Sequence, residues 1–187
     1  MTEAESLAVP MPRSRDPRRR GDAALLRAID RGDEAALAEL FNRHWHAAHR
    51  AAWLVSHDTQ AAEDIAQEAF LAALQRLDGF DRRRPFAPWL HRIVVNRAID
   101  FVRARTARRE VAASALPEPV SEPPRTLDDD TLSALAGLRP EQRAVVVLRH
   151  LLGYTPGQIA TLLDLPRGTV NSRLRRALDE LAGELGR

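Results

Sequence analysis

Residues 153–181, GYTPGQIATLLDLPRGTVNSRLRRALDEL, constrain the fold more strongly than any other part of this chain. Thr155, with Gln158 three residues later, predicts a capping box, and Pro156 favours the first position of the helix that follows. The letters DLP predict a short turn, and a second helix is expected from about Arg167. A helix, a tight turn and a second helix at this spacing predict a helix-turn-helix unit.

The second helix of this unit is expected to have one apolar face and one polar face. On a helical wheel the apolar positions form one narrow stripe: Val170, Leu174, Ala177 and Leu181. The other positions carry arginine, asparagine, serine and threonine, with no acid before Asp179. Arginine can bind guanine edges, asparagine can bind adenine, and the hydroxyls can bind phosphates or bases. Together with the capping box and the turn, this face favours DNA binding over a merely solvated helix.

The remainder of the chain also predicts helices, because alanine and leucine are abundant and there are only nine glycines. Asp22, Asp33 and Asp58 are predicted N-caps of three successive helices. The prolines of GFDRRRPFAPWL then permit a fourth helix from near Trp89 to about Arg108. The predicted fold class is therefore all-α.

Two segments lack helical patterning and divide the chain. Residues 1–20 contain three prolines and five arginines and predict a disordered basic tail. A stretch rich in proline and acid, AASALPEPVSEPPRT, predicts a stiff, extended linker over about 111–127. The prediction is two small helical domains, 21–110 and 128–187, of which the second contains the helix-turn-helix.

Charge is segregated along the chain although the formal net charge is only +2. All 28 basic residues are arginine, which binds phosphate in a planar, bidentate manner. Residues 82–109 hold nine arginines and one acid, whereas 58–78 hold five acids and one arginine. A second acidic segment, 110–130, holds six acids and one arginine. One surface is therefore expected to meet a polyanion and another a basic partner.

The predicted fourth helix has its own polar stripe. Its members recur at helical spacing: Arg92, Asn96, Asp100 and Arg103. The apolar positions face the other way: Val95, Ala98, Ile99 and Val102. The preceding loop, GFDRRRPF, is basic and contains two aromatic residues. Arginines beside aromatic and amide groups are suited to binding a single nucleic-acid strand.

In this order, AAEDIAQEAFLAAL, PFAPWLHRIVVNRAIDFVRAR, a proline-rich linker and LRPEQRAVVVLRHLLGYTPGQIATLLDLPRGTVNSRLRRAL resemble the extracytoplasmic-function (ECF) group of bacterial sigma-70 factors. The resemblance covers roughly residues 22–183. It implies a subunit that binds core RNA polymerase, reads and opens the promoter −10 element with its first domain and reads the −35 element with its second. It implies no enzymatic activity, no cofactor and no metal.

The resemblance also implies roles for individual residues. A helix with Asp64, Gln67 and Glu68 would dock on the coiled coil of the largest polymerase subunit, and the flap of the second-largest subunit would be another contact. The loop 79–85 would receive a flipped-out base. The implied −10 residues are Phe80, Asp81, Arg82, Arg92, Asn96, Arg97, Asp100 and Arg103. The implied −35 residues are Arg167, Thr169, Asn171, Ser172, Arg173, Arg175 and Arg176.

Two positions depart from the family pattern. Asp164 stands in the turn where the family usually has glycine. Aspartate tolerates a left-handed conformation better than most residues, so the turn is expected to survive. Asn171 stands where the family often has lysine or arginine, which removes a phosphate contact or changes the base preference.

Parts of the sequence are also compatible with two other classes of protein. A conventional helix-turn-helix regulator would bind duplex DNA as a dimer, but it would not need the acidic helix and the basic fourth helix. A metal-dependent enzyme could be centred on His44, His46 and His49. Residues two apart point about 200° apart on a helix, and no carboxylate stands at helical spacing beside these histidines. The pair Asp64 and Glu68 lacks a nucleophile, a glycine-rich loop or a metal frame, which favours a docking surface over catalysis.

Trp45, Trp53 and Trp89 are predicted core residues rather than base-stacking ones. The chain has no cysteine, so disulfides and cysteine-based zinc sites are excluded. No apolar stretch approaches the ~20 residues of a membrane span, and the N-terminus lacks a signal-peptide core. A cytoplasmic protein that is not membrane-inserted is therefore expected, and the resemblance adds an anti-sigma factor as a partner.

Overall fold

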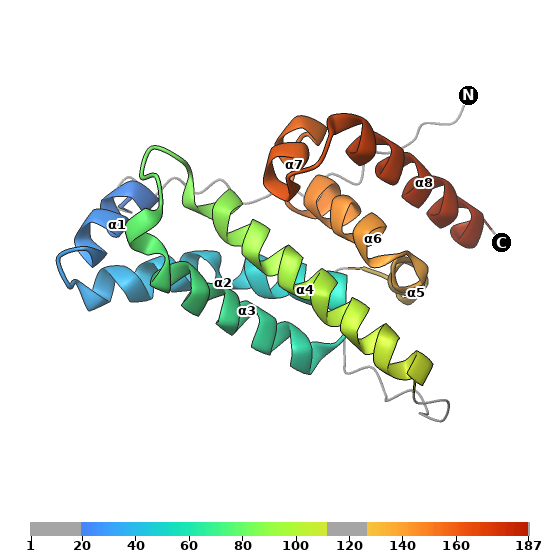
Figure 1. Ribbon diagram of the computed structural model, residues 1–187, viewed down its shortest axis with the longest axis horizontal. Helices are drawn as coiled ribbons and strands as arrows, with labels where there is room; N and C mark the ends of the chain where they lie inside the picture. The colour runs from blue at the N-terminus through green and yellow to red at the C-terminus, as the bar shows by residue number, and fades with distance from the viewer. Residues whose placement is uncertain (1–19, 112–126, 187) are drawn as a thin grey trace.

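The computed structural model describes residues 20–111 and 127–186, and within these ranges all regular structure is helical (Figure 1). The first part comprises α1 (Asp22–Ile29), α2 (Glu34–Ser56), α3 (Thr59–Gln75), the 3-10 turn η1 (Leu77–Gly79) and α4 (Phe86–Val111). The second comprises α5 (Asp129–Gly137), α6 (Pro140–Val146), the π-turn η2 (Val147–Leu151), α7 (Pro156–Leu163) and α8 (Arg167–Leu185). The all-α fold of two small helical domains is confirmed.

Two of the three predicted aspartate caps are confirmed. Asp33 and Asp58 accept hydrogen bonds from the backbone N–H groups of Ala36 (3.0 Å) and Ala61 (2.9 Å). The prediction for Asp22 is wrong, because this residue lies inside the first turn of α1 and Gly21 precedes the helix without a side-chain cap. Its carboxylate instead contacts two side chains of α2: Arg43 at 2.7 Å and His44 at 2.9 Å. These partners compete for the oxygens that would otherwise cap the helix.

Helix α4 begins at Phe86, three residues before the predicted start, and continues to Val111 beyond the predicted end. Pro88 lies in its first turn, where a backbone N–H has no partner inside the helix and proline is tolerated. The side chain of Phe86 is 1% exposed. Burial of this ring fixes the position of Phe86 in the core. The helix therefore starts at Phe86 and not after Pro88.

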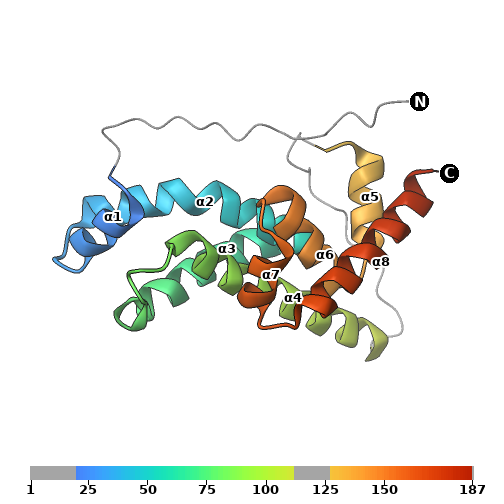
Figure 2. The ribbon, with the colours of Figure 1, turned by 90° about the horizontal axis from the view of Figure 1, so that it is seen from above.

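Helices α2, α3 and α4 pack against one another, and α1 covers part of α2 (Figures 1 and 2). Their facing positions include many fully buried alanines, which allow close approach of the helix axes: Ala48, Ala52, Ala62, Ala66, Ala69 and Ala98. Trp53 is buried as predicted. Trp45 and Trp89 are half-buried and pack against this core, so the prediction holds fully for Trp53 and in part for the other two.

The second domain confirms the predicted helix-turn-helix. Thr155 and Gln158 form the capping box, and Pro156 is the first residue of α7. Asp164 adopts the left-handed conformation (φ 54°, ψ 50°) that ends α7, and α8 begins at Arg167. Helix α8 packs on α5, α6 and α7.

The two domains are in contact: α6 packs on α2 and α4, and α7 packs on α4 (Figure 2). The predicted tail and the predicted linker fall almost wholly outside the described residues. In 20–111 and 127–186, no helix is both long enough and apolar enough to cross a membrane.

Candidate nucleic-acid and partner interfaces

Helix α4 presents the predicted polar stripe at the surface. Its exposed members are Arg92, Asn96, Asp100 and Arg103. The opposite side of the helix is in the core, with Val95, Ala98 and Ile99 buried and Val102 half-buried. The amide of Asn96 therefore stands on an exposed face between Arg92 and Asp100, where it can form hydrogen bonds with a base.

A cleft of 680 Å³ opens beside the start of this stripe. Its walls come from the loop before α4, from α4 and from α7; they include Phe80, Arg84, Trp89, Arg92, Tyr154 and Gln158. The rings of Trp89 and Phe80 lie 4.5 Å apart between centroids, so Trp89 forms part of an aromatic wall beside two arginines. Such a wall can stack a nucleic-acid base while the arginines bind its phosphate. Because sequence reasoning assigned Trp89 to the core, this use of its ring was missed.

The residues predicted in the preceding loop have different surroundings. Phe80 is 7% exposed and is one of the residues that line the cleft. Asp81 accepts hydrogen bonds from Arg83, and this guanidinium lowers the pKa of the Asp81 carboxyl. Arg82 is bound to Asp30, the residue that follows α1, at 2.6 Å. Arg84, which was not singled out from the sequence, is largely exposed beside the cleft.

Helix α8 carries the predicted recognition surface. Val170, Leu174 and Ala177 are buried. The exposed candidates are Arg167, Asn171, Arg175 and Arg176, and the half-buried ones are Thr169, Ser172 and Arg173. The hydroxyl of Ser172 donates to the carbonyl of Thr169 at 3.0 Å. None of the four arginines takes part in an ion pair within the described ranges, although Arg173 interacts electrostatically with Glu141. The charges of Arg167, Arg175 and Arg176 are therefore available to a phosphate.

Helix α3 exposes Asp64, Gln67 and Glu68, while Ile65 and Ala69 face the core. Gln67 donates to Glu63 at 3.1 Å. Glu68 binds Arg97 of α4. Arg97, a predicted DNA-binding residue, is therefore engaged by a residue predicted to bind polymerase, and the two assignments are not independent.

An apolar groove of 460 Å³ runs between α2 and α3 next to this acidic face. Its lining includes Leu37, Phe41, Phe70, Leu71 and Leu74. Leu71 is 59% exposed, so its side chain adds apolar surface at the open side of the groove. An apolar groove whose lining includes Glu34, next to the exposed acids of α3, suits an amphipathic partner with basic flanks.

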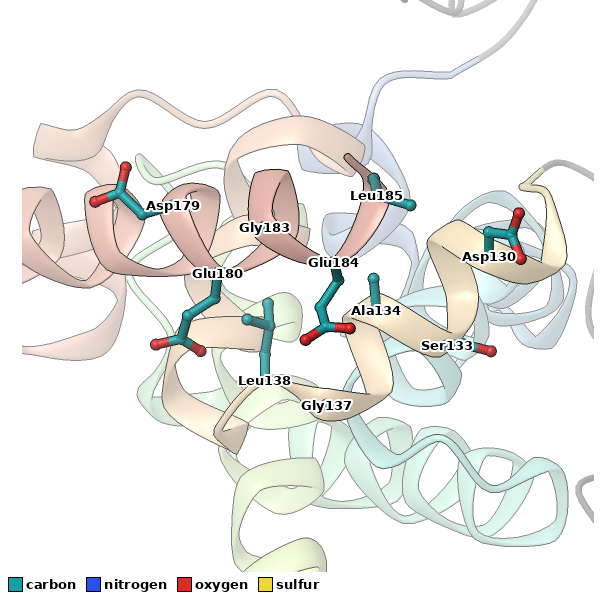
Figure 3. Close-up of a pocket in the computed structure, with 10 residues that line it drawn as sticks. All are labelled: Asp130, Ser133, Ala134, Gly137, Leu138, Asp179, Glu180, Gly183, Glu184 and Leu185. Atoms are coloured by element: carbon teal, nitrogen blue, oxygen red, sulfur yellow. The ribbon is translucent and has the colours of Figure 1, made fainter. Parts of the chain in front are cut away.

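A second groove, of 840 Å³, lies between α5 and the end of α8 (Figure 3). Glu180 and Glu184 extend from α8 toward the turn that contains Gly137 and Leu138, and Asp130 stands on α5 (Figure 3). Glu180 accepts a hydrogen bond from Gln142 at 2.7 Å. No residue of this acidic groove was predicted to be functional.

The candidate metal ligands are not assembled into a site in the part of the chain that the structure describes. No group of three metal-ligating side chains occurs in 20–111 and 127–186. His44 binds Asp22, His46 is exposed, and His49 stacks on Trp45 with 5.7 Å between ring centroids.

His91 lies where α4 meets the second domain. It is 5% exposed, and its Nδ1 shares a hydrogen bond of 2.8 Å with the hydroxyl of Tyr154. Burial, with a smaller contribution from His44, lowers the pKa of His91 to about 4. Burial also raises the pKa of Tyr154 to about 12. Both groups are therefore neutral at physiological pH.

The buried imidazole should make stability depend on pH. The unfolded chain protonates His91 at its ordinary pKa of about 6.5, whereas the folded chain remains neutral down to about pH 4. The contribution of His91 to the free energy of unfolding is thus complete above pH 6.5. It falls by about 2–3 kcal/mol as the pH decreases to 4.5. Urea unfolding at pH 7 and 4.5 should show a smaller loss for His91→Gln than for the wild-type protein. Equal losses would contradict this prediction.

Comparison with known families matches both halves of the chain. Residues 40–108 match the family described as Sigma-70 region 2, and residues 129–181 match Sigma-70, region 4. The ECF RNA polymerase sigma factor SigM of Mycobacterium tuberculosis is 39% identical over 171 residues, which cover 89% of this chain and 86% of the relative. The ECF RNA polymerase sigma-E factor of Escherichia coli is 30% identical over 179 residues and covers 86% of this chain and 92% of its own.

Two solved structures are similar over most of the chain. The sigma factor RpoE in complex with the anti-sigma factor NepR, from Bartonella quintana, has a TM-score of 0.70 at 25% identity and covers 80% of this chain and 96% of its own. CnrH in complex with the cytosolic domain of CnrY has a TM-score of 0.67 at 31% identity, covering 88% and 97%. Both alignments are too long to be confined to one domain of this chain.

Proposed function

The chain belongs to the ECF group of the sigma-70 family of RNA polymerase sigma factors, and we propose that it directs core polymerase to promoters by reading their −10 and −35 elements. It works by binding and not by catalysis. The observation that carries the proposal is the presence of three different surfaces on one chain. These are the acidic face of α3, the polar stripe and aromatic cleft of α4, and the arginine face of α8.

Region 4 (residues 129–181), the family segment that holds the helix-turn-helix, reads the −35 element. The N-terminal part of α8 enters the major groove, where Arg167, Asn171 and Arg176 reach base edges or phosphates. The exposure of these side chains and the lack of ion pairs to their guanidinium groups within the described ranges support this assignment. The hydroxyls of Thr169 and Ser172 position the helix on the backbone.

Region 2 (residues 40–108) reads and opens the −10 element. Asn96 and its neighbours in the stripe bind the exposed strand, and a base turned out of the duplex enters the cleft beside Trp89. Unstacking a base costs a few kcal/mol, which stacking and arginine–phosphate contacts offset. Arg84 and Arg92 are the basic groups nearest this cleft.

The acidic face of α3 docks on the coiled coil of the largest polymerase subunit. The exposed carboxylate of Asp64 and the neighbouring apolar groove with Leu71 support this role. Region 4 contacts the flap of the second-largest subunit. Since the chain acts on polymerase, we place it in the cytoplasm. An anti-sigma factor would cover the same faces, by analogy with the sigma factor RpoE, which was solved in complex with the anti-sigma factor NepR.

Transcription from a cognate promoter tests the proposal. The purified protein, added to core RNA polymerase, should support run-off transcription from a promoter of its own genome, and it should co-purify with the core enzyme. Binding to duplex DNA without any association with core polymerase would favour a conventional helix-turn-helix regulator instead. Such a result would overturn the proposal.

Replacing Asn96 by alanine should impair strand opening more than initial binding. The variant loses base contacts that form only after the strands separate, so open complexes should decrease about tenfold. Closed complexes should change less than twofold. Permanganate footprinting measures the first quantity and gel shift at low temperature the second. Thr106→Ala, an exposed change on the same helix one turn beyond Arg103, the last residue of the stripe, is the control. Equal losses of both complexes would contradict the role of Asn96.

A further inference from the structure

An ion pair joins the loop 81–85, which precedes α4, to helix α1. Arg82 belongs to this loop, and its Nη2 donates to the carboxylate of Asp30 at 2.6 Å. Asp30 directly follows α1 and stands 52 residues earlier in the chain. The loop and the end of α1 therefore lie side by side (Figure 1). The same loop contributes to the wall of the cleft that contains Trp89.

The other hydrogen bonds of this loop are internal to it. Asp81 accepts from the backbone N–H and from Nε of Arg83, both at 3.0 Å. The backbone N–H of Arg84 donates to the carbonyl of Asp81 at 2.9 Å. Within the described ranges, the bond of Arg82 is the one hydrogen bond that joins the loop to another element. The orientation of the loop therefore depends on that bond.

The guanidinium of Arg82 is turned toward the protein. Its side chain is 28% exposed, against 91% for Arg83 and 77% for Arg84. Its Nη1 is buried and has no hydrogen-bond partner within the described ranges. Asp81 and Arg84 line the cleft, whereas Arg82 between them does not. Because a phosphate needs accessible N–H groups, these observations favour an internal role for Arg82 over the DNA contact that the resemblance implies.

Helix α1 gives the loop a fixed support. Leu25 and Leu26 are at most 1% exposed and pack in the core of region 2. Asp22, the first residue of α1, is bound to two side chains of α2. The carboxylate of Asp30 does not stabilise α1 itself, because it stands at the negative end of the helix dipole. The guanidinium of Arg82 compensates this charge.

We infer that Asp30 and Arg82 position the loop for base capture, so that α1 shapes the −10 pocket without touching DNA. The inference rests on the proposed function. Both are positioning residues, because neither is among the residues that line the cleft. They hold the loop against α1, which leaves Arg84 exposed at the edge of the cleft for a phosphate. Helix α1 precedes residues 40–108, so an element outside the matched segment controls a loop of region 2.

Asp30→Ala tests the inference in holoenzyme assembled from the full chain. The variant breaks the ion pair, so open complexes on a cognate promoter should decrease about fivefold while closed complexes change less than twofold. Permanganate footprinting and gel shift at low temperature measure the two. Arg31→Gln, an exposed charge change at the next residue, is the control and should alter neither complex.

The alternative, a direct DNA contact by Arg82, predicts a different result for Asp30→Ala. Removing a carboxylate that engages a DNA-binding guanidinium would leave promoter opening unchanged or improve it. Either of these outcomes would overturn the inference while the proposed function stands. Absence of promoter-dependent transcription with the wild-type holoenzyme would instead contradict the proposed function.

Exchange of the two charges provides a second arm. Arg82→Asp alone places two carboxylates together and should remove most open complexes. Asp30→Arg/Arg82→Asp restores an ion pair with reversed charges and should recover at least half of the wild-type level. A double variant no better than Arg82→Asp would show that the pair does not position the loop. Circular dichroism on heating checks that each variant is folded.

Salt dependence provides a third arm. The probe is a single-stranded oligonucleotide with the −10 sequence of the same promoter, bound by the holoenzyme. A lost phosphate contact lowers the slope of log affinity against log salt concentration by about 0.7. Arg82→Gln should leave this slope unchanged, whereas Arg84→Gln should reduce it. A reduced slope for Arg82→Gln would mean that its guanidinium binds DNA, and the inference would be wrong.

Discussion

Asp64→Arg should weaken the binding of core RNA polymerase by about 100-fold or more. Its carboxylate is exposed on α3, and within the described ranges it has no ion pair that would reduce its charge. If α3 docks on a basic coiled coil, reversal of this charge replaces an attraction by a repulsion, which costs several kcal/mol at a protein interface. Titration of dye-labelled protein with core polymerase at a fixed salt concentration measures the change.

Asp78→Arg is the matched control for this prediction. It makes the same charge reversal in the turn η1 that follows the helix, and Asp78 is also exposed. It should weaken polymerase binding by less than tenfold, and both variants should unfold at the same temperature as the wild-type protein. Equal weakening by the two variants would mean that the net charge of the protein, and not the face with Asp64, controls docking.

Trp53→Ala should destabilise region 2 by about 3–5 kcal/mol, the largest stability effect expected from a single replacement in this chain. The indole is 1% exposed in the core of α2, α3 and α4, so its removal leaves a cavity that the surrounding helices cannot fill. Chemical denaturation followed by circular dichroism measures the loss. Because typical domains have only 5–15 kcal/mol of stability in total, partial unfolding at 37 °C is expected.

Trp89→Ala distinguishes a tryptophan that packs in the core from one that stacks on a base. Trp89 is half-buried beside Phe80 and lines the cleft, so its loss should cost less stability than the loss of Trp53. It should instead reduce open-complex formation, since base stacking on an aromatic ring contributes about 1–3 kcal/mol per base. A stability loss as large as that of Trp53→Ala, with normal strand opening, would show that Trp89 is only a core residue.

Sequence reasoning predicted features that depend on residues close together along the chain. Thr155 and Gln158 are three residues apart, and their reciprocal hydrogen bonds need nothing beyond the first turn of α7. The stripe that contains Asn96 follows from the helical period alone. The left-handed conformation of Asp164 could likewise be expected from the sequence, because it depends on the turn and not on a distant partner.

Other features were missed because their causes lie far along the chain. The start of α4 was placed too late, since the burial of Phe86 in the core could not be seen from its neighbours. Trp89 was assigned to the core because its ring size is visible in the sequence but the cleft beside it is not. Arg97 and Glu68, proposed for different partners, turned out to be bound to each other across α3 and α4.

By itself, the sequence determined the presence of the helices, two of the three predicted aspartate caps, the helix-turn-helix and the faces on which acids, arginines and amides stand, because these follow from backbone geometry over a few residues. Only the tertiary structure decided which charges are free and which are engaged. Asp22 does not cap α1 as predicted but binds Arg43 and His44. Arg143 is buried and donates to the carbonyl of Val55, 88 residues away. Such contacts arise from the packing of whole helices, so no local pattern records them.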